Sequence, residues 1–399
     1  ECCLLSNGVY DVMLTESGLS FACAGGVGIY RGPRGPLSGP AGITISLAAE
    51  SAELRLLPRH GGKELSSAWH FSGSSAVISG RKEGLAFRCS TAVSANDIAE
   101  LRLVEIKSET GFTGRLILEF EPMLANPRDY VNHPAFHRLG LHARMQDGAL
   151  LIRRLPRAGL PGAWLCLACD QPMTASANYG GAPLGWLSAP LVRASVPVTL
   201  PAGGVFAVRF ALSFGASSEN VFSAAQHTLG MGASDFADLS LACAALYGMT
   251  AKDAAAAMGM VSALAFARVR GPVTEGRDSL WRLGISGDLP IIAAEIGSDE
   301  QLPAARDLIR RHALLRTYGL KSDLIFLTKD GGDYLRTTSR AVSDALSKLG
   351  LESVYGASGG VYTVDSNQGA QAIGKNAAVM IDLSAPDQPR RHEAGKAFP

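Results

Sequence analysis

The stretch LWRLGISGDLPIIAAEIG, residues 280–297, marks the place where the pattern of the chain changes. A turn rich in Gly, Ser and Asp leads into an unbroken apolar run, which predicts a loop entering a buried strand. Phosphate-binding glycine loops instead follow a strand and open a helix, and the stretch contains neither GxGxxG nor GxxxxGK[ST]. We therefore interpret it as a domain junction whose turn is held by local hydrogen bonds of Ser286 and Asp288.

After this junction the sequence alternates strands with helices. Helices are predicted over 300–319 and 333–350, with Gly319 and Gly350 just past their ends, where a C-terminal glycine is expected. Strands are predicted at 289–296, 322–328, 353–357 or 360–364, and 378–383. Alternating βα units with continuous apolar strands predict a small parallel sheet covered by helices.

Before the junction the sequence is typical of short strands that are separated by turn residues. In many of these strands apolar and polar residues alternate. They are predicted at 8–16, 42–50, 53–59, 75–81, 85–94, 99–109, 114–122, 148–155, 163–170, 191–200 and 204–214. So many short strands predict a large antiparallel β-sandwich.

The segment between these blocks has a helical period. Helices are predicted at 218–230, 235–248 and 250–270, the last opening with a capping-box pattern, Thr250 and Asp253. The predicted division is a β-sandwich domain over 1–215, a helical linker over 216–275, an α/β domain over 276–386 and a C-terminal linker over 387–399.

The composition excludes several classes of protein. Of 399 residues, 47% are hydrophobic and 18% charged, as in globular chains of two or three domains. With 37 basic and 36 acidic residues and no long basic run, a nucleic-acid partner is not expected. The sequence contains no apolar run of about 18 residues, so we predict no transmembrane segment. ECCLLSNGVY does not have the pattern of a signal peptide. The seven cysteines are scattered and form no disulfide framework, which favours a cytoplasmic location for the chain. There it would be a separate protein or part of a larger membrane-associated one.

Two clusters have the residue types of a metal or redox site. His133, His137 and His142 lie in DYVNHPAFHRLGLHAR, where the proline and the strand-like text favour a loop whose histidines bond backbone groups. Cys166 and Cys169 form a CxxC, but no second pair follows at zinc-like spacing, which favours two small residues in a buried strand. We predict neither a metal nor a cofactor.

Residues for hydrolytic chemistry are equally unspecific. Glu119 and Glu121 share one face of a predicted strand, whereas glycoside chemistry needs two carboxylates at a defined separation across a cleft. Asp330 and Asp333 lie in KDGGDY, but no nucleophile and base can be placed beside them. We identify no catalytic residue.

Three segments carry a family resemblance: LLSNGVYDVMLTESG (4–18), HPAFHRL (133–139) and LWRLGISGDLPII (280–292). In this order they resemble the N-terminal, non-catalytic region of proteins of the glycoside hydrolase family 94 and glycosyltransferase 36 type. These include cyclic β-1,2-glucan synthases and 1,2-β-oligoglucan phosphorylases. The resemblance implies a galactose-mutarotase-like β-supersandwich, a helical linker and an α/β domain. In longer members an (α/α)6 barrel supplies the general acid and the phosphate site.

The resemblance implies an ancillary carbohydrate-binding or scaffold region of a β-glucan-processing glycosyltransferase or phosphorylase. Its partners would be a β-glucan or gluco-oligosaccharide and a catalytic barrel in the same or another chain. The candidate substrate-side residues are Asn7, Tyr10, His133, Arg282, Ser286 and Asp288. The alternatives are a stand-alone carbohydrate-binding or partner-recruiting scaffold and an enzyme with a site near Asp330.

Overall fold

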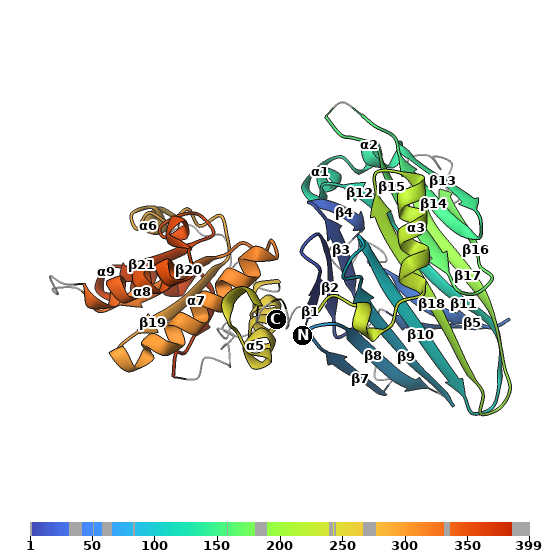
Figure 1. The fold of residues 1–399 in the computed structure, drawn as a ribbon, viewed down its shortest axis with the longest axis horizontal. Helices are drawn as coiled ribbons and strands as arrows, with labels where there is room; N and C mark the ends of the chain where they lie inside the picture. The colour runs from blue at the N-terminus through green and yellow to red at the C-terminus, as the bar shows by residue number, and fades with distance from the viewer. Residues whose placement is uncertain are drawn as a thin grey trace, which may run out of the picture. The chain divides into compact units, whose positions relative to one another are not determined.

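The computed structural model describes residues 2–31, 42–50, 52–57, 66–82, 84–157, 159–179, 190–238, 242, 245–265, 277–330 and 336–384. The chain divides into two compact units, which we call the β unit (Cys3–Leu239) and the α/β unit (Ser240–Pro399). The first is built of antiparallel sheets and the second contains a small parallel sheet, as Figure 1 shows. The predicted fold class is therefore confirmed.

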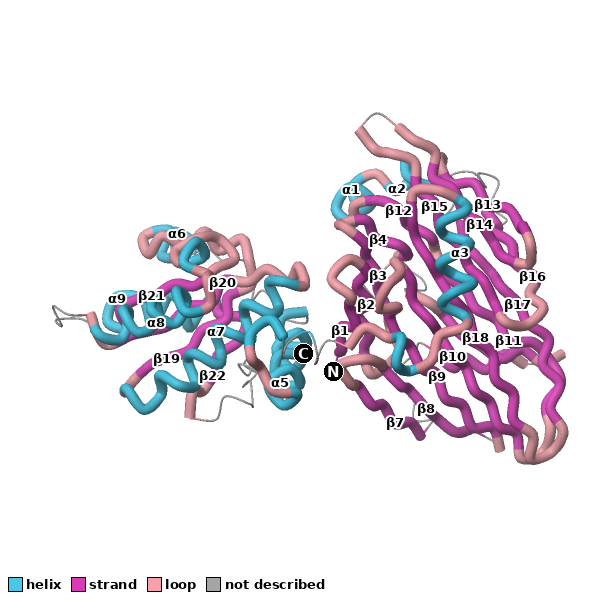
Figure 2. Tube along the Cα trace, viewed as in Figure 1, coloured by secondary structure: helices cyan, strands magenta, loops and turns pink. Residues whose placement is uncertain are grey.

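The described residues of the β unit form three sheets, whose strands are drawn in magenta in Figure 2. One contains, in spatial order, β1 (Cys2–Ser6), β2 (Tyr10–Thr15), β3 (Ser20–Ala24), β4 (Val27–Tyr30) and β12 (Pro122–Ala125). The largest contains β13 (Leu141–Gln146), β14 (Ala149–Arg154), β15 (Ala163–Cys169), β18 (Val205–Gly215), β10 (Ala99–Ser108), β9 (Leu85–Val93), β8 (Ala76–Lys82) and β7 (Ser66–Phe71). The third contains β16 (Thr174–Tyr179), β17 (Pro190–Leu200), β11 (Phe112–Phe120), β5 (Thr44–Ala48) and β6 (Glu53–Leu57). Every strand predicted before residue 215 overlaps one of these.

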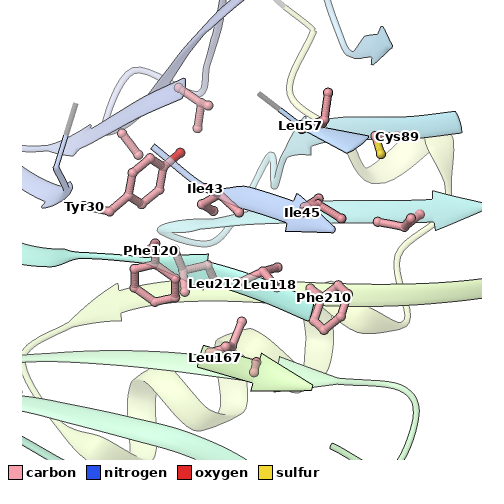
Figure 3. Packing of buried hydrophobic residues seen from close by; sticks show 14 of the residues in the cluster. Tyr30, Ile43, Ile45, Leu57, Cys89, Leu118, Phe120, Leu167, Phe210 and Leu212 are labelled. Atoms are coloured by element: carbon pink, nitrogen blue, oxygen red, sulfur yellow. The ribbon is translucent and has the colours of Figure 1, made fainter. Parts of the chain in front are cut away.

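The core of the β unit is formed by residues of all three sheets. Alternate residues of β18, such as Phe210 and Leu212, pack there with Leu118 of β11 and Ile45 of β5 (Figure 3). This alternation follows from strand geometry, because successive side chains point to opposite faces. β13 differs, since it lies at the sheet edge and its residues 142–146 are all exposed.

A polar network lies inside this core. Arg102 of β10 donates to Glu100 at 3.4 Å and to the hydroxyl of Tyr30 at 3.0 Å. The side chains of Glu100 and Arg102 are 0% and 3% exposed. Burial raises the pKa of Glu100, while the Arg102 charge opposes this rise. The network therefore fixes charges inside the sandwich, away from solvent.

Helix α3 (Ser218–Leu229) packs on the outer face of the largest sheet. Val221 and Ala225 contact a second apolar cluster that includes Cys166 and Ala211. At the end of the helix, Arg209 of β18 donates to the carbonyl of Leu229 at 2.9 Å, satisfying a carbonyl that helix ends leave open. α3 therefore belongs to the β unit, although the sequence predicted it as the start of a linker.

The rest of the predicted linker is described in part. α5 (Ala251–Ala265) begins with the predicted capping box, since Asp253 accepts from the Thr250 amide at 3.0 Å and donates its own amide to Thr250 at 3.2 Å. Asp253 also pairs with Arg311 at 3.3 Å. Residues 239–241 and 243–244 of the helix predicted at 235–248, and residues 266–270 of the one predicted at 250–270, lie outside the described residues. The division between the units falls within the predicted linker; the four predicted domain boundaries stay predictions.

The α/β unit contains a four-stranded parallel sheet in the order β21 (Val361–Asp365), β20 (Asp323–Thr328), β19 (Ile291–Ile296) and β22 (Ala377–Ile381). Its longer helices are α7 (Leu302–Thr317), α8 (Thr337–Lys348) and α9 (Ser366–Asn376), and the short α6 (Arg277–Trp281) precedes the junction. α7 packs against α8 and α5, whereas α9 packs against α6 and the sheet. The sheet is thus covered on both faces.

Helix α9 was not predicted. Its sequence, SNQGAQAIGKN, is polar and contains two glycines, which helix propensities disfavour. Its buried residues are Gly369 and Ile373, and a Cβ at Gly369 would lie 2.2 Å from Val364 of β21. Close packing of α9 on the sheet, rather than helix propensity, therefore explains this element.

Candidate functional site

The HPAF segment forms a corner of two short helices, α1 (Pro127–Asn132) and α2 (Pro134–Arg138), which we call the α1–α2 corner. The loop predicted for this segment is wrong. Each helix has a proline at its first position, where the missing amide hydrogen costs nothing. Asn126 caps α1 by accepting from the Arg128 amide at 3.0 Å. His133 ends α1 and precedes α2, and its own amide donates to the Asp129 carbonyl at 2.9 Å.

Glu121 fastens this corner to the sandwich. Its carboxylate accepts from Arg31 at 2.8 Å and from Arg138 at 2.9 Å. The buried Tyr130 hydroxyl donates to the same carboxylate and accepts from Arg138 at 3.1 Å. Burial acts to raise the pKa of Glu121, but the hydrogen bonds from Tyr130 and Arg31 outweigh it and lower that pKa. Burial raises the pKa of Tyr130 to about 12.

The carboxylates singled out from the sequence are therefore tied to arginines. Glu121 stays ionised between two guanidinium groups, so it has no proton to donate at neutral pH. Glu119 lies 2.6 Å from Arg193 of the neighbouring strand. A general acid for glycoside cleavage must hold a proton near neutral pH, and Glu121 does not meet this requirement.

The outer surface of the corner is aromatic. Phe136 is 59% exposed, and its ring lies 6.1 Å from the exposed ring of His133 in an edge-on arrangement. The guanidinium of Arg157 lies 5.6 Å from the centre of the Phe136 ring and donates to the Phe136 carbonyl. Val131 and Leu139 are also exposed beside it in sequence, at 57% and 43%. The corner thus presents an apolar ring together with a nitrogen-rich rim.

Two other predicted residues of the β unit are committed to its structure. Asn7 donates to the carbonyls of Ser94 and Asp97 at 2.8 and 2.9 Å and accepts from the Tyr10 amide at 2.8 Å. It therefore ties the β1–β2 turn to a distant loop. Tyr10 is 0% exposed, and burial raises its pKa well above the usual value. A sugar has no access to Tyr10, which belongs to the core instead of a substrate surface.

The three remaining predicted residues belong to the α/β unit. Ser286 accepts from the Asp288 amide at 3.3 Å, as predicted for a locally bonded turn, and its carbonyl accepts from the Trp281 indole at 3.1 Å. Arg282 is exposed and its amide donates to Asp278 at 3.3 Å. Asp288 is exposed and contributes to the raised pKa of the buried Asp323, for which burial is the larger cause. The structure assigns these residues to the junction turn.

The cysteine and histidine clusters do not form a metal or redox pair. Cys166 packs under α3, while Cys169 contacts the core between the sheets, because an odd spacing on a strand places two side chains on opposite faces. Burial raises the pKa of both thiols to about 12. Among the described residues, no group of three or more His, Cys, Asp or Glu has the arrangement of a metal site.

A family model matches most of the β unit. The model described as "Glycosyl hydrolase 94, supersandwich domain" matches residues 1–181. Residues 1–181 are thus similar to this supersandwich domain. The resemblance carried by LLSNGVYDVMLTESG and HPAFHRL is thereby confirmed, and the α1–α2 corner lies within the supersandwich domain.

Individual relatives cover little of the chain or are distant from it. Cyclic beta-(1,2)-glucan synthase NdvB of Rhizobium meliloti is 31% identical over 75 residues, which are 19% of this chain and 3% of the synthase. A bacterial glucoamylase complexed with acarbose has 10% identity and a TM-score of 0.42, covering 64% of this chain and 39% of its own. A GalM/aldose epimerase homologue from C. elegans has 8% identity and a TM-score of 0.33, covering 55% and 99%. The match to the glucan synthase therefore covers only a small part of the length of that protein.

Some residues of the corner had no signal in the sequence. Phe136 lies within the HPAF segment, but Arg157 follows it at a distance of 21 residues with no pattern linking the two.

The α/β unit contains a match to the GxSxG pattern, GASGG at 356–360, which the sequence analysis did not identify. It precedes β21 instead of linking a strand to a following helix, so it is not a nucleophile elbow.

Proposed function

We propose that this chain is the ancillary, carbohydrate-binding region of a β-glucan-processing glycosyltransferase or phosphorylase. The observation that carries the proposal is the match of residues 1–181 to the glycosyl hydrolase 94 supersandwich domain. The glucan synthase relative supports a β-glucan as the carbohydrate. Catalysis would come from an (α/α)6 barrel in the same or another chain, with which this region would work.

The α1–α2 corner is the proposed sugar-facing surface. An exposed aromatic ring offers an apolar face to the C–H groups of a pyranose, and Phe136 is such a ring. Arg157 and His133 border it with hydrogen-bond donors suited to sugar hydroxyls. The Glu121 cluster supports the corner from below, so that the ring is presented on a fixed base.

Isothermal titration with linear β-1,2-gluco-oligosaccharides tests this proposal. We expect the chain to bind them in preference to β-1,4-linked oligosaccharides of equal length. Phe136→Ser should weaken binding about tenfold, which corresponds to about 1.4 kcal/mol of lost ring contact. Val205→Ser is the matched control, because Val205 is a similarly exposed apolar residue of the β unit, at 65%, on β18.

Equal binding by both variants would remove the corner from the proposal, and an absence of oligosaccharide binding would remove the sugar-binding role itself. The three exposed apolar residues of the corner, Val131, Phe136 and Leu139, favour a second candidate function in that case. This is the partner-recruiting scaffold, with the barrel of a cyclic β-1,2-glucan synthase as the partner. Co-elution of the two in size-exclusion chromatography, lost in Phe136→Ser, would support it.

The structure adds one observation about membranes. Within the described ranges, no helix has the length and apolar character needed to cross a bilayer.

A further inference from the structure

A pocket lies at the carboxyl edge of the parallel sheet in the α/β unit. Its volume is about 450 Å³, within the range of about 300–1,000 Å³ typical of small-molecule sites. Glu295 and Gly297 line it at the end of β19, Lys329 follows β20, and Met380 and Asp382 belong to the end of β22. Three strands thus contribute to one pocket.

This position has a topological cause. The chain builds β19, β20 and β21 outward in one direction and then returns to place β22 on the other side of β19. α7 and α8 cover one face, while α9 makes the return crossing on the other. β22 therefore lies beside β19, and the pocket lies outside the carboxyl ends of these strands, where open parallel sheets commonly bind ligands.

The polar groups around this edge disfavour a phosphate. Helix N-termini bind phosphates through open backbone amides, but here side chains occupy the amides. Asp330 accepts from the Thr338 and Ser339 amides of α8 at 3.2 and 2.8 Å. Asp365 caps α9 by accepting from the Asn367 amide at 2.8 Å.

The loop after β19 is occupied in the same way. Gln301 accepts from the Gly297 amide at 2.7 Å, and the turn before α7 carries two acidic residues, Asp299 and Glu300. Acidic groups at this position repel an incoming anion. A nucleotide or a sugar phosphate is therefore a poor fit for this pocket.

We propose that the pocket binds a neutral polyhydroxy compound of the size of a sugar. The lining carries two carboxylates and one ammonium group, and Lys329 lies 3.2 Å from Glu295. Carboxylates accept hydrogen bonds from hydroxyl groups, and an ammonium donates to them. The side chains of Met380 and Leu383 supply an apolar surface for C–H groups.

The charge balance separates this ligand class from its charged analogues. With two negative groups and one positive group, the lining attracts a neutral polyol without penalty but repels an anion. This site is independent of the α1–α2 corner, because its lining residues all belong to the α/β unit. Its test can therefore fail or succeed separately from that of the proposed function.

Methionine-methyl NMR of the full chain tests the pocket, with D-glucose and the disaccharide β-D-glucosyl-(1→2)-D-glucose as neutral probes and glucose 6-phosphate as the anionic one. The Met380 signal is assigned with Met380→Leu. We expect a saturable shift of this signal with a neutral probe, and at least tenfold weaker binding of the phosphate. Glu295→Gln, which keeps the size of a half-exposed side chain, should weaken the neutral probe about tenfold.

Asp307→Asn is the matched control, because it removes the carboxylate of another exposed ion pair in the same unit, with Arg310 on α7. It should leave the Met380 titration unchanged. Phe136→Ser should also leave it unchanged, which distinguishes the pocket from the corner. A Met380 signal that does not respond to either neutral probe overturns the proposal, as does tighter binding of glucose 6-phosphate or equal weakening by Glu295→Gln and Asp307→Asn.

Discussion

Each unit holds a carboxylate and a cation at short distance, and the two pairs differ strongly in their exposure to solvent. In the β unit, Arg102 lies 3.4 Å from Glu100, and the side chains are 3% and 0% exposed. In the α/β unit, Lys329 lies 3.2 Å from Glu295, and the side chains are 64% and 51% exposed. The two pairs therefore have different interaction energies at similar distances, because water screens the exposed pair and not the buried one.

The difference teaches where chemistry can occur in this chain. A buried pair that also bonds Tyr30 is committed to the fold, since separating it would leave a charge inside the core. Each member of an exposed ion pair can leave the other and bind a ligand at little cost in free energy. The Glu100 carboxylate is therefore structural, whereas the Glu295 carboxylate is accessible to a ligand.

The largest expected effect comes from breaking the buried pair. Arg102→Met leaves the Glu100 carboxylate in the core without its cation and should lower the free energy of unfolding by about 3–5 kcal/mol. Urea unfolding, followed by hydrogen exchange of β10 and β18 peptides, measures this loss in the β unit alone. The double variant Glu100→Gln with Arg102→Met should recover part of it, because no charge then remains buried. A loss below about 1 kcal/mol in the single variant contradicts the comparison.

The next largest effect on stability is expected from a buried histidine, and its size lies between the effects of the buried and the exposed ion pair. Burial lowers the pKa of His312 on α7 from 6.5 to about 4, and its ring bonds the Ser322 carbonyl at 2.7 Å. The unfolded chain binds a proton below pH 6.5, whereas the folded chain keeps this ring neutral until pH 4. Stability of the α/β unit should therefore decrease as the pH falls through this window, by about 3 kcal/mol in total.

Hydrogen exchange of α7 and β20 peptides at pH 7, 5.5 and 4.5 checks this window. His312→Gln retains a donor for the Ser322 carbonyl but does not titrate, so its stability should depend less on pH than that of the natural chain. The same pH dependence in both proteins would assign the effect to other groups.

The smallest effect is expected for the exposed pair. Lys329→Met removes one member of a pair that is more than half exposed, so the free energy of unfolding should change by less than about 0.5 kcal/mol. Raising the salt concentration should remove even this difference. Thermal unfolding in low and high salt provides the measurement, and a destabilisation similar to that of Arg102→Met would show that the two environments are not different.

The parts of the fold that depend on local patterns were predictable. Alternating strands, the Thr250–Asp253 capping box and the glycines after α7 and α8 follow from rules of a few residues. Short or polar elements were not, because tertiary contacts decide them. α9 depends on the close approach of Gly369 to Val364, and α1 and α2 are held by the contacts of Tyr130 and Arg138 with Glu121.

The candidate site was predictable only where its residues are neighbours in sequence. HPAF pointed to His133 and Phe136, but Arg31 reaches Glu121 from 90 residues away in the sequence. Tyr10 shows the converse limit, since an aromatic residue beside a turn is equally compatible with a surface and with the core. Sequence patterns give residue types, and burial, which decides their use, is set by the whole fold.

The exposed edge strand β13 has a consequence for the solubility of the protein. An outer strand offers backbone donors and acceptors to the strand of another molecule, which is a common route to aggregation. Along this edge the side chains of 142–146 are all exposed, and Arg144 lies over the ring of Trp164 at 5.9 Å. Antiparallel pairing of two copies centred on Arg144 would place two guanidinium groups opposite each other, and their like charges would oppose the pairing. Arg144 therefore disfavours aggregation through this edge.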